Sequence, residues 1–307
     1  MNDNVPPLPA SKPSVVPLWR RSAGLRVLWF FLLMIVFQGI AAGLSRLFGV
    51  APNDLKTMHG NLPATLLGVL PFVLAYWVLA RFVERRPLAE LSWRKLPQLL
   101  PGLLAALLLF ALVTLELWSA GAYRITGFGD APLWSLFLLT AVGPGIGEEI
   151  FTRGILFRLA EESLGTWWAL LVSALFFGFA HIANPGATVW SSLAIMIEAG
   201  LLFGMLYHVT RSLWWCIGLH AGWNFMQGAV FGIPVSGIAV DGLIESQLEG
   251  PDWLDGGGFG AEASVLTVLT CSIATLWMIR RMQRNGSRVL PYWKRAKRED
   301  APPAALQ

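Results

Sequence analysis

Six of the polar residues that interrupt the apolar runs of this sequence share motif-like spacings, and several of their side chains are of the kinds that carry out acid–base chemistry. They are Glu148, Glu149, Arg153, His181, His220 and Asn224. Inside a membrane, an ionisable group at the centre of a span costs about 2.5 to 3.5 kcal/mol on insertion scales, so each one needs a partner or a function. These positions are therefore the first candidates for a functional site.

Helical spacing separates the two adjacent glutamates. Residues four apart share one face of a helix with 3.6 residues per turn, so Glu149 and Arg153 are predicted to form an ion pair. Glu148 points about 100° away from Glu149 and has no counter-charge nearby in the sequence. The ion pair is expected to support the structure, whereas Glu148 is a candidate general base.

The histidines lie on two further apolar runs. His220 and Asn224 are four residues apart, as are Phe177 and His181, so each run presents polar groups on one face. Helix bundles build their sites from side chains on facing helices. We therefore predict that Glu148 lines one intramembrane cavity together with His181, His220 and Asn224.

Depth in the membrane restricts this prediction. An unbroken helix from Leu133 places Glu148 about 22 Å below its start at 1.5 Å per residue, whereas the run that ends at His181 closes near the outer face. At that separation the two side chains do not meet. Residues 143–147 hold a proline between glycines, which disrupts a helix. We therefore predict a break there, with residues 133–142 forming a separate half-helix.

The rest of the chain consists of the apolar segments that must position these groups. Hydrophobic residues make up 55% of the sequence and charged residues 14%, whereas about 25% of a soluble domain is charged. Runs long enough to cross the hydrocarbon, about 20 residues each, begin near Val27, Leu62, Pro97, Leu133, Thr166, Thr188, Leu213 and Ala263. The sequence thus predicts an all-α integral membrane protein with about eight transmembrane helices in a single bundle that encloses the cavity.

Basic residues gather in alternate loops and in the tail from Arg280 to Arg298. By the positive-inside rule this pattern places both termini in the cytoplasm. The predicted organisation is a cytoplasmic tail at residues 1–26, a multi-span membrane domain at residues 27–282 and a basic cytoplasmic tail at residues 283–307. Because the basic charge follows the loops, it indicates membrane topology, and no nucleic-acid partner is expected.

Three motifs in order resemble those of a known family of membrane proteases. Residues 148–153 (E-E-I-F-T-R) resemble its E-E-x-x-x-R motif, residues 177–181 (F-G-F-A-H) its F-x-x-x-H motif, and residues 220–224 (H-A-G-W-N) its H-x-x-x-N motif. The family is the CPBP group, which contains the type II CAAX prenyl endopeptidases and the bacteriocin-processing and immunity relatives called Abi proteins. The resemblance spans residues 133–231, the predicted catalytic core.

The resemblance implies hydrolysis of a peptide bond inside the membrane. In such a reaction Glu148 takes a proton from water, His181 holds that water, and His220 and Asn224 donate hydrogen bonds to the developing oxyanion. The partners implied are the lipid bilayer and a peptide or lipidated, CAAX-like peptide substrate.

A metal centre is the alternative interpretation of the same residues. Glu148, His181 and His220 could supply three ligands to zinc and leave a fourth position for water. The H-E-x-x-H zinc signature is absent, and Cys216 and Cys271 lie inside apolar runs without metal-type spacing. We expect metal-independent chemistry, with the zinc alternative left open.

Two other functions fit a membrane bundle with polar groups inside it. A catalytically silent scaffold or immunity protein keeps the fold and binds a partner, whereas a proton-coupled transporter uses Glu148, Glu198 and the histidines as a relay. Glu116 and Glu198 match no motif of the family and stay outside the predicted site. The compact loops suit a multi-pass protein of a bacterial inner membrane.

Overall fold

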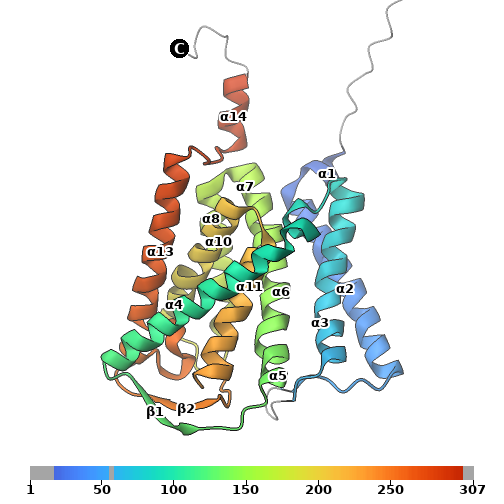
Figure 1. The fold of residues 1–307 in the computed structure, drawn as a ribbon. Coiled ribbons are helices and arrows are strands. Elements are labelled where there is room, and N and C mark those ends of the chain that lie inside the picture. The colour runs from blue at the N-terminus through green and yellow to red at the C-terminus, as the bar shows by residue number, and fades with distance from the viewer. Residues whose placement is uncertain (1–16, 55–58, 300–307) are drawn as a thin grey trace, which may run out of the picture.

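Helices dominate the protein in a computed structural model that describes residues 17–54 and 59–299 (Figure 1). Most of the long helices run side by side, and α4 crosses obliquely over α11. The short helices α1, α7 and α14 lie at one end of the bundle, and the two strands lie at the other end. The sequence-based prediction of an all-α membrane bundle is confirmed.

The α-helices in chain order are α1 (Leu18–Arg21), α2 (Ala23–Leu47), α3 (Leu62–Val78), α4 (Leu99–Ser119), α5 (Leu133–Leu136), α6 (Gly143–Glu149), α7 (Arg158–Leu164), α8 (Thr166–Ala180), α9 (Val189–Ile195), α10 (Leu202–Thr210), α11 (Leu213–Asn224), α12 (Asp252–Asp255), α13 (Val265–Arg284) and α14 (Tyr292–Glu299). Wider, π-helical turns form η1 (Leu79–Glu84), η4 (Phe137–Val142), η5 (Ile150–Phe157), η7 (Met196–Leu201) and η8 (Phe225–Val230). Tighter, 3-10 turns form η2 (Ala89–Leu91), η3 (Trp93–Gln98), η6 (His181–Ala183), η9 (Gly257–Phe259) and η10 (Ala261–Ala263). The strands β1 (Tyr123–Phe128) and β2 (Ile244–Leu248) pair antiparallel.

Six helices within the described part of the chain are long and apolar enough to cross a membrane. They are Ala23–Leu47, Leu62–Glu84, Trp93–Ser119, Thr166–Ala183, Val189–Thr210 and Val265–Arg284. The protein is therefore a multi-pass membrane protein, but the predicted number of eight spans is not confirmed. The other two predicted spans, which begin near Leu133 and Leu213, are helical to residues 164 and 230 and carry polar site residues, which lower their hydropathy.

The predicted helix break at residues 143–147 is wrong. From Leu133 to Leu164 the elements α5, η4, α6, η5 and α7 follow one another without a gap. Pro144 lies in the first turn of α6, directly after the π-helical turns of η4. Pro144 has no N–H to donate to the carbonyl oxygen of residue 140, and the wide turns of η4 before it are a usual place for a register change. The backbone therefore changes its hydrogen-bonding pattern there and stays helical.

The turn at Gly165 sets the depth of the site. Gly165 has a φ of +83°, and a Cβ there would lie 2.7 Å from the carbonyl oxygen of Val289, so only glycine fits. Glu148 precedes this turn by 17 residues and His181 follows it by 16. Both residues therefore lie about 25 Å from the turn at 1.5 Å per residue. The expectation that an unbroken helix keeps Glu148 and His181 at different depths is wrong, because α8 ends at the level of Glu148.

Glycines let the site-bearing helices approach their neighbours closely. A Cβ at Gly102 of α4 would lie 2.5 Å from the carbonyl oxygen of Trp215 in α11, and one at Gly218 would lie 2.3 Å from that of Leu99. At Gly147 of α6, a Cβ would lie 3.3 Å from the Phe72 ring of α3. Small residues at such crossings are the usual means of packing helices in a membrane. They fix α11 and α6, the two helices that carry most of the candidate site.

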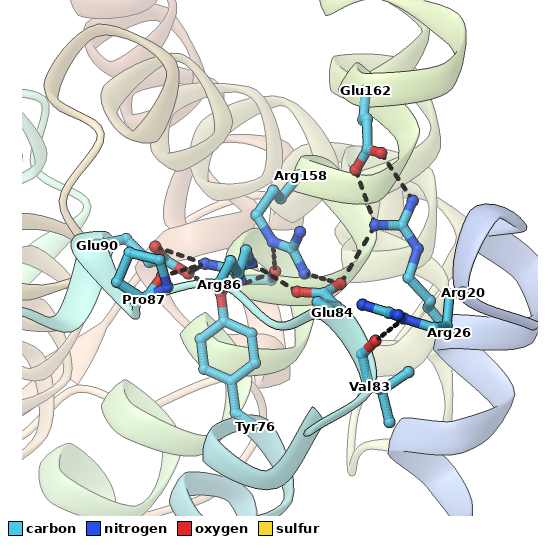
Figure 2. Close-up of polar contacts among 11 residues, drawn as sticks. Arg20, Arg26, Tyr76, Val83, Glu84, Arg86, Pro87, Glu90, Arg158 and Glu162 are labelled. Atoms are coloured by element: carbon cyan, nitrogen blue, oxygen red, sulfur yellow. Dashed lines mark hydrogen bonds and ion pairs between the residues drawn. The ribbon is translucent and has the colours of Figure 1, made fainter. Parts of the chain in front are cut away.

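Charged side chains form a network at the end of the bundle that carries α1 and α7, as Figure 2 shows. Arg26 of α2 binds Glu162 of α7 through two hydrogen bonds of 2.9 Å. Glu84 accepts from Arg158 at 2.7 Å and from Arg86 at 2.6 Å. We call the set the ion-pair cluster, and its members are Arg26, Glu84, Arg86, Glu90, Arg158 and Glu162. It joins α2 and η1 to α7.

The predicted tails lie partly outside the described residues. Residues 1–16 and 300–307, which belong to the two predicted tails, lie outside the described residues. The described part of the first tail contains α1 and the start of α2, and the described part of the last tail contains α14.

Candidate active site

One cavity of about 130 Å³ brings together the four residues predicted to carry the chemistry. Glu148 comes from α6, His181 from η6, and His220 and Asn224 from α11. The other residues that line it are Leu139, Thr140, Pro144, Asn184, Val235, Ser236 and Ile238. Polar groups from distant parts of the chain thus meet in one small space inside the bundle.

Glu148 faces this cavity without an arginine or lysine partner among the described residues. Its side chain is 39% exposed, and its Oε2 lies 4.0 Å from Nε2 of His220. A separation of 4.0 Å is too long for a direct hydrogen bond, and a water is the usual bridge between polar groups at such distances. The arrangement suits a carboxylate that acts on a water molecule.

Glu149 orients His220, a contact that the sequence analysis missed. Nδ1 of His220 lies 2.9 Å from Oε1 of Glu149, and both side chains are buried. Arg153 donates to the same oxygen from Nη1 at 2.9 Å, as the spacing predicted. Since an ionised carboxylate only accepts hydrogen bonds, Nδ1 of His220 carries the proton. The remaining ring nitrogen, Nε2, is the one that faces Glu148.

Arg153 holds this arrangement to the neighbouring helices. Its Nη2 donates to the carbonyl oxygen of Ala199 at 3.0 Å, and its guanidinium lies over the rings of Phe177 and Phe203, at 4.8 and 5.1 Å from their centroids. A guanidinium over an aromatic face is attracted by the ring quadrupole. The Phe177 of the F-x-x-x-H motif therefore packs against the ion pair of the E-E-x-x-x-R motif.

His181 has one ring nitrogen committed to the backbone. Its Nδ1 lies 2.7 Å from the carbonyl oxygen of Phe177, one turn earlier in α8. A carbonyl oxygen only accepts, so Nδ1 is the donor and Nε2 is left for other contacts. The ring is also in contact with that of Phe177, with centroids 4.8 Å apart.

Asn224 binds a backbone carbonyl oxygen that would be bonded to the N–H of residue 144 in a regular helix. Its Nδ2 donates to the carbonyl oxygen of Thr140 at 2.9 Å. In a regular helix this oxygen accepts from the N–H of residue 144, but Pro144 has none. The amide of Asn224 has two N–H donors, so one of them is free to bond elsewhere in the cavity. The proline thus has a role in the site different from the predicted helix break.

A zinc centre does not fit the described residues. No group of three His, Cys, Asp or Glu side chains lies close enough to hold one ion within residues 17–54 and 59–299. The side chains of the cavity therefore do not form a three-ligand metal group in this structure.

The two unassigned glutamates have different surroundings. Both carboxylate oxygens of Glu116 lie within 2.9 Å of the hydroxyl of Thr270, which joins α4 to α13. Glu198 is buried beside the site, in a chamber that it shares with His181, His220 and Glu262. Neither lines the cavity that contains Glu148.

Four of the cavity residues outside the motifs lie in loops. Asn184 follows His181 by three residues, and Val235, Ser236 and Ile238 come from the connection between η8 and β2. The sequence signal beside the last three is Gly237, whose φ in the structure is +84°. A glycine in a polar loop marks a turn but does not reveal what the turn contacts.

Comparison with known proteins supports the assignment of the family. Residues 130–226 match the family model described as "Type II CAAX prenyl endopeptidase Rce1-like". No curated protein matches the chain. The matched segment begins and ends within a few residues of the predicted catalytic core and contains Glu148, His181, His220 and Asn224. The match therefore supports membership of the CPBP family through the segment that contains these four residues.

Proposed function

We propose that the protein is an intramembrane endopeptidase that hydrolyses a peptide bond in a membrane-associated or lipidated, CAAX-like substrate. The observation that carries the proposal is the cavity in which Oε2 of Glu148 faces Nε2 of His220 across 4.0 Å. His181 and Asn224 line the same cavity. The family match supports a CAAX-type protease activity, and the geometry supports the roles given below.

The first step is attack by water. A water molecule between Glu148 and the histidines gives one proton to the Glu148 carboxylate, and its oxygen attacks the carbonyl carbon of the substrate. His181 holds that water through Nε2, because its other ring nitrogen is bonded to the backbone. A base positioned in this way contributes about 10²- to 10⁴-fold to the rate.

The second step is collapse of the tetrahedral intermediate. The free N–H of Asn224 and the Nε2–H of His220, which carries a proton on each ring nitrogen throughout the reaction, donate to the oxyanion, and Glu149 stabilises that cation from the far side of the ring. Glu148 returns its proton to the amide nitrogen as the C–N bond breaks. The products are a carboxylic acid, which ionises in water, and an amine, so atoms and charges balance.

We further propose that residues 27–282 form the membrane domain, with residues 133–231 as its catalytic core, in a bacterial inner membrane. The end of the bundle with the ion-pair cluster and α14 is proposed to face the cytoplasm, together with both termini. Its basic residues support this orientation, because cytoplasmic loops of membrane proteins carry an excess of Lys and Arg. Figure 1 places α1 and α14 at that same end.

The proposal is tested with purified protein in detergent and two quenched fluorescent substrates, a prenylated CAAX peptide and a bacteriocin-leader peptide. Wild-type protein is compared with Glu148→Ala and His220→Ala, each with and without a metal chelator. We expect turnover by the wild type that both substitutions abolish and that chelator leaves unchanged. Loss of turnover with chelator and its return with zinc would contradict the metal-independent mechanism. Equal turnover by Glu148→Ala would contradict the role of Glu148.

A further inference from the structure

Part of the lining of the catalytic cavity comes from residues outside the family match. Val235, Ser236 and Ile238 line the cavity with Glu148, whereas the match ends at residue 226. We call residues 234–238 the wall turn. Val235 and Ile238 are bonded to each other by two backbone hydrogen bonds of 2.9 Å, so the turn is a closed loop.

Three partners from different segments hold the wall turn. The carboxylate of Glu262 accepts from the backbone N–H of Ser236 at 2.6 Å and from its hydroxyl at 3.1 Å. Nδ2 of Asn184 donates to the carbonyl oxygen of Ser236 at 2.9 Å. Nε2 of Gln227 donates to the carbonyl oxygen of Pro234 at 2.6 Å. Each polar group that these partners bind is thereby fixed in place.

Glu262 holds Ser236 in an unusual backbone conformation. Ser236 has a φ of +48°, a left-handed value that residues other than glycine adopt only where surrounding contacts enforce it. Glu262 is 3% exposed and lies outside the spanning helices, in η10. Burial raises the pKa of Glu262, and the hydrogen bonds from Ser236 oppose that rise. A buried carboxylate that receives two hydrogen bonds from one strained residue is suited to hold that residue in position.

Glycines make the wall turn rigid. A Cβ at Gly237 would lie 1.8 Å from the carbonyl oxygen of Pro185, and one at Gly260 would lie 2.1 Å from that of Pro234. The N–H of Gly237 also donates to the carbonyl oxygen of Phe259 at 2.8 Å. The turn is therefore clamped between two other loops with no room for larger residues. A clamped wall presents a space of fixed size.

The wall turn also has an apolar side. Val235 is 5% exposed and packs in a small cluster with Leu136, Ala229 and Val240, and Ile238 packs against the same cluster. Both residues also line the cavity, together with polar groups of η4, α6 and α11. A substrate main chain that faces Glu148 and Asn224 therefore places a neighbouring side chain against aliphatic groups.

We propose that the wall turn determines which side chain the protein accepts beside the scissile bond, with Val235 and Ile238 as the specificity-determining residues and Glu262 as the positioning residue that holds them through Ser236. This inference rests on the proposed peptidase function. It separates the molecule into helices that carry the chemistry and a loop that selects the substrate.

The test uses prenylated CAAX peptides that differ only in the residue after the prenyl-cysteine, which is Ala, Val, Leu, Phe or Trp. Binding is measured by fluorescence anisotropy to full-length protein that carries Glu148→Gln, and cleavage is measured with Glu148 intact. Ile238→Ala is expected to shift preference toward Phe and Trp by about tenfold, since one or two methylene groups in an apolar pocket change selection by about 10- to 200-fold. Ile238→Phe is expected to shift preference the opposite way, toward Ala.

Substitution of Glu262 tests the positioning role. Glu262→Ala is expected to flatten the preference among peptides and to raise KM more than it lowers kcat, and Glu262→Gln, which keeps one acceptor oxygen, is expected to restore part of it. Glu116→Gln is the matched control, because Glu116 also accepts hydrogen bonds from a hydroxyl but does not line the cavity. It should leave the preference unchanged.

The outcomes separate this inference from the proposed function. An unchanged order of preference in Ile238→Ala, Ile238→Phe and Glu262→Ala would overturn the inference, even where wild-type protein cleaves the peptides. A changed order of binding in protein that cleaves none of them would support the wall turn and contradict the peptidase. No binding of any peptide would overturn both.

Discussion

The ion-pair cluster and the cavity that contains Glu148 both hold buried charged groups, but the partners of these groups differ. In the ion-pair cluster every carboxylate has an arginine partner, and Glu84 alone has three, from α2, the loop after η1, and α7 (Figure 2). In the catalytic cavity, the nearest basic group to Glu148 among the described residues is the His220 ring, 4.0 Å away. A cluster whose charges are all paired joins helices, whereas a carboxylate that faces a cavity without a full partner is available for chemistry.

Glu149 is paired with an arginine, as in the ion-pair cluster, and it also contacts His220 of the cavity. Its substitution is therefore expected to have the largest effect. Glu149→Gln removes the charge that Arg153 and His220 share, and it leaves a buried guanidinium without a carboxylate. We expect the free energy of unfolding to fall by about 3 to 5 kcal/mol. The activity of the folded fraction should fall about 10²-fold or more, because His220 loses its orienting partner. Unfolding in detergent and cleavage per folded protein measure the two effects separately.

A change in the free energy of unfolding alone, or in the activity of the folded fraction alone, would show that Glu149 has only one of these two roles. Full activity with reduced stability would leave it as a structural ion pair, which is the role that the sequence analysis gave it.

Substitution within the ion-pair cluster should affect stability and leave catalysis intact. Glu84 is almost fully buried and binds Arg26, Arg86 and Arg158. Glu84→Gln is expected to lower the free energy of unfolding by about 3 to 5 kcal/mol, because three arginines lose a shared carboxylate. Cleavage per folded protein should match the wild type. A specific loss of kcat in folded Glu84→Gln protein would mean that the cluster acts on the cavity.

Substitution of Asn224, in contrast, should affect catalysis. Asn224→Ala removes one proposed donor to the oxyanion, and we expect kcat to fall about 10²- to 10³-fold. KM should change little, since the interaction forms only in the transition state. Steady-state kinetics on the prenylated peptide provide the measurement. An increase in KM with kcat preserved would assign Asn224 to substrate binding.

Substitution in an exposed ion pair should have the smallest effect on stability and cleavage. Arg124 and Glu249 join β1 to the residue after β2, with an N–O distance of 2.6 Å and side chains that are 58% and 46% exposed. Such pairs contribute about 0 to 1 kcal/mol, and salt screens them further. Arg124→Ala should leave both stability and cleavage close to the wild type. A larger loss of stability would mean that the strand pair is held by this contact.

The sequence predicted the residues of the cavity better than the geometry around them. Four-residue spacing placed His220 and Asn224 on one face of a helix, and motif order placed Glu148 and His181 on separate helices, because both signals depend on local periodicity. The contact of His220 with Glu149 joins residues 71 apart, and it depends on how α11 is rotated against α6. No local pattern contains that rotation.

The continuous helix through Pro144 and the wall turn depend on packing between distant segments, which local sequence patterns do not specify. A proline between glycines usually interrupts a helix, but the wide turns of η4 take up the change and Asn224 binds the freed carbonyl. The wall turn was not anticipated because its conformation is enforced by Glu262 and by backbone contacts at Gly237 and Gly260. Loops of this kind are specified by their partners rather than by their own residues.

The most direct test of the central claim compares wild-type and Glu148→Gln protein in proteoliposomes, under single-turnover conditions in water enriched in oxygen-18. Glutamine keeps the shape of Glu148 and removes its capacity to accept a proton, so unfolding should be the same for both proteins. We predict that the wild type forms a product with one oxygen-18 atom in its new carboxylate and that Glu148→Gln forms no product above background. Labelled product formed at the same rate by both proteins would contradict the account.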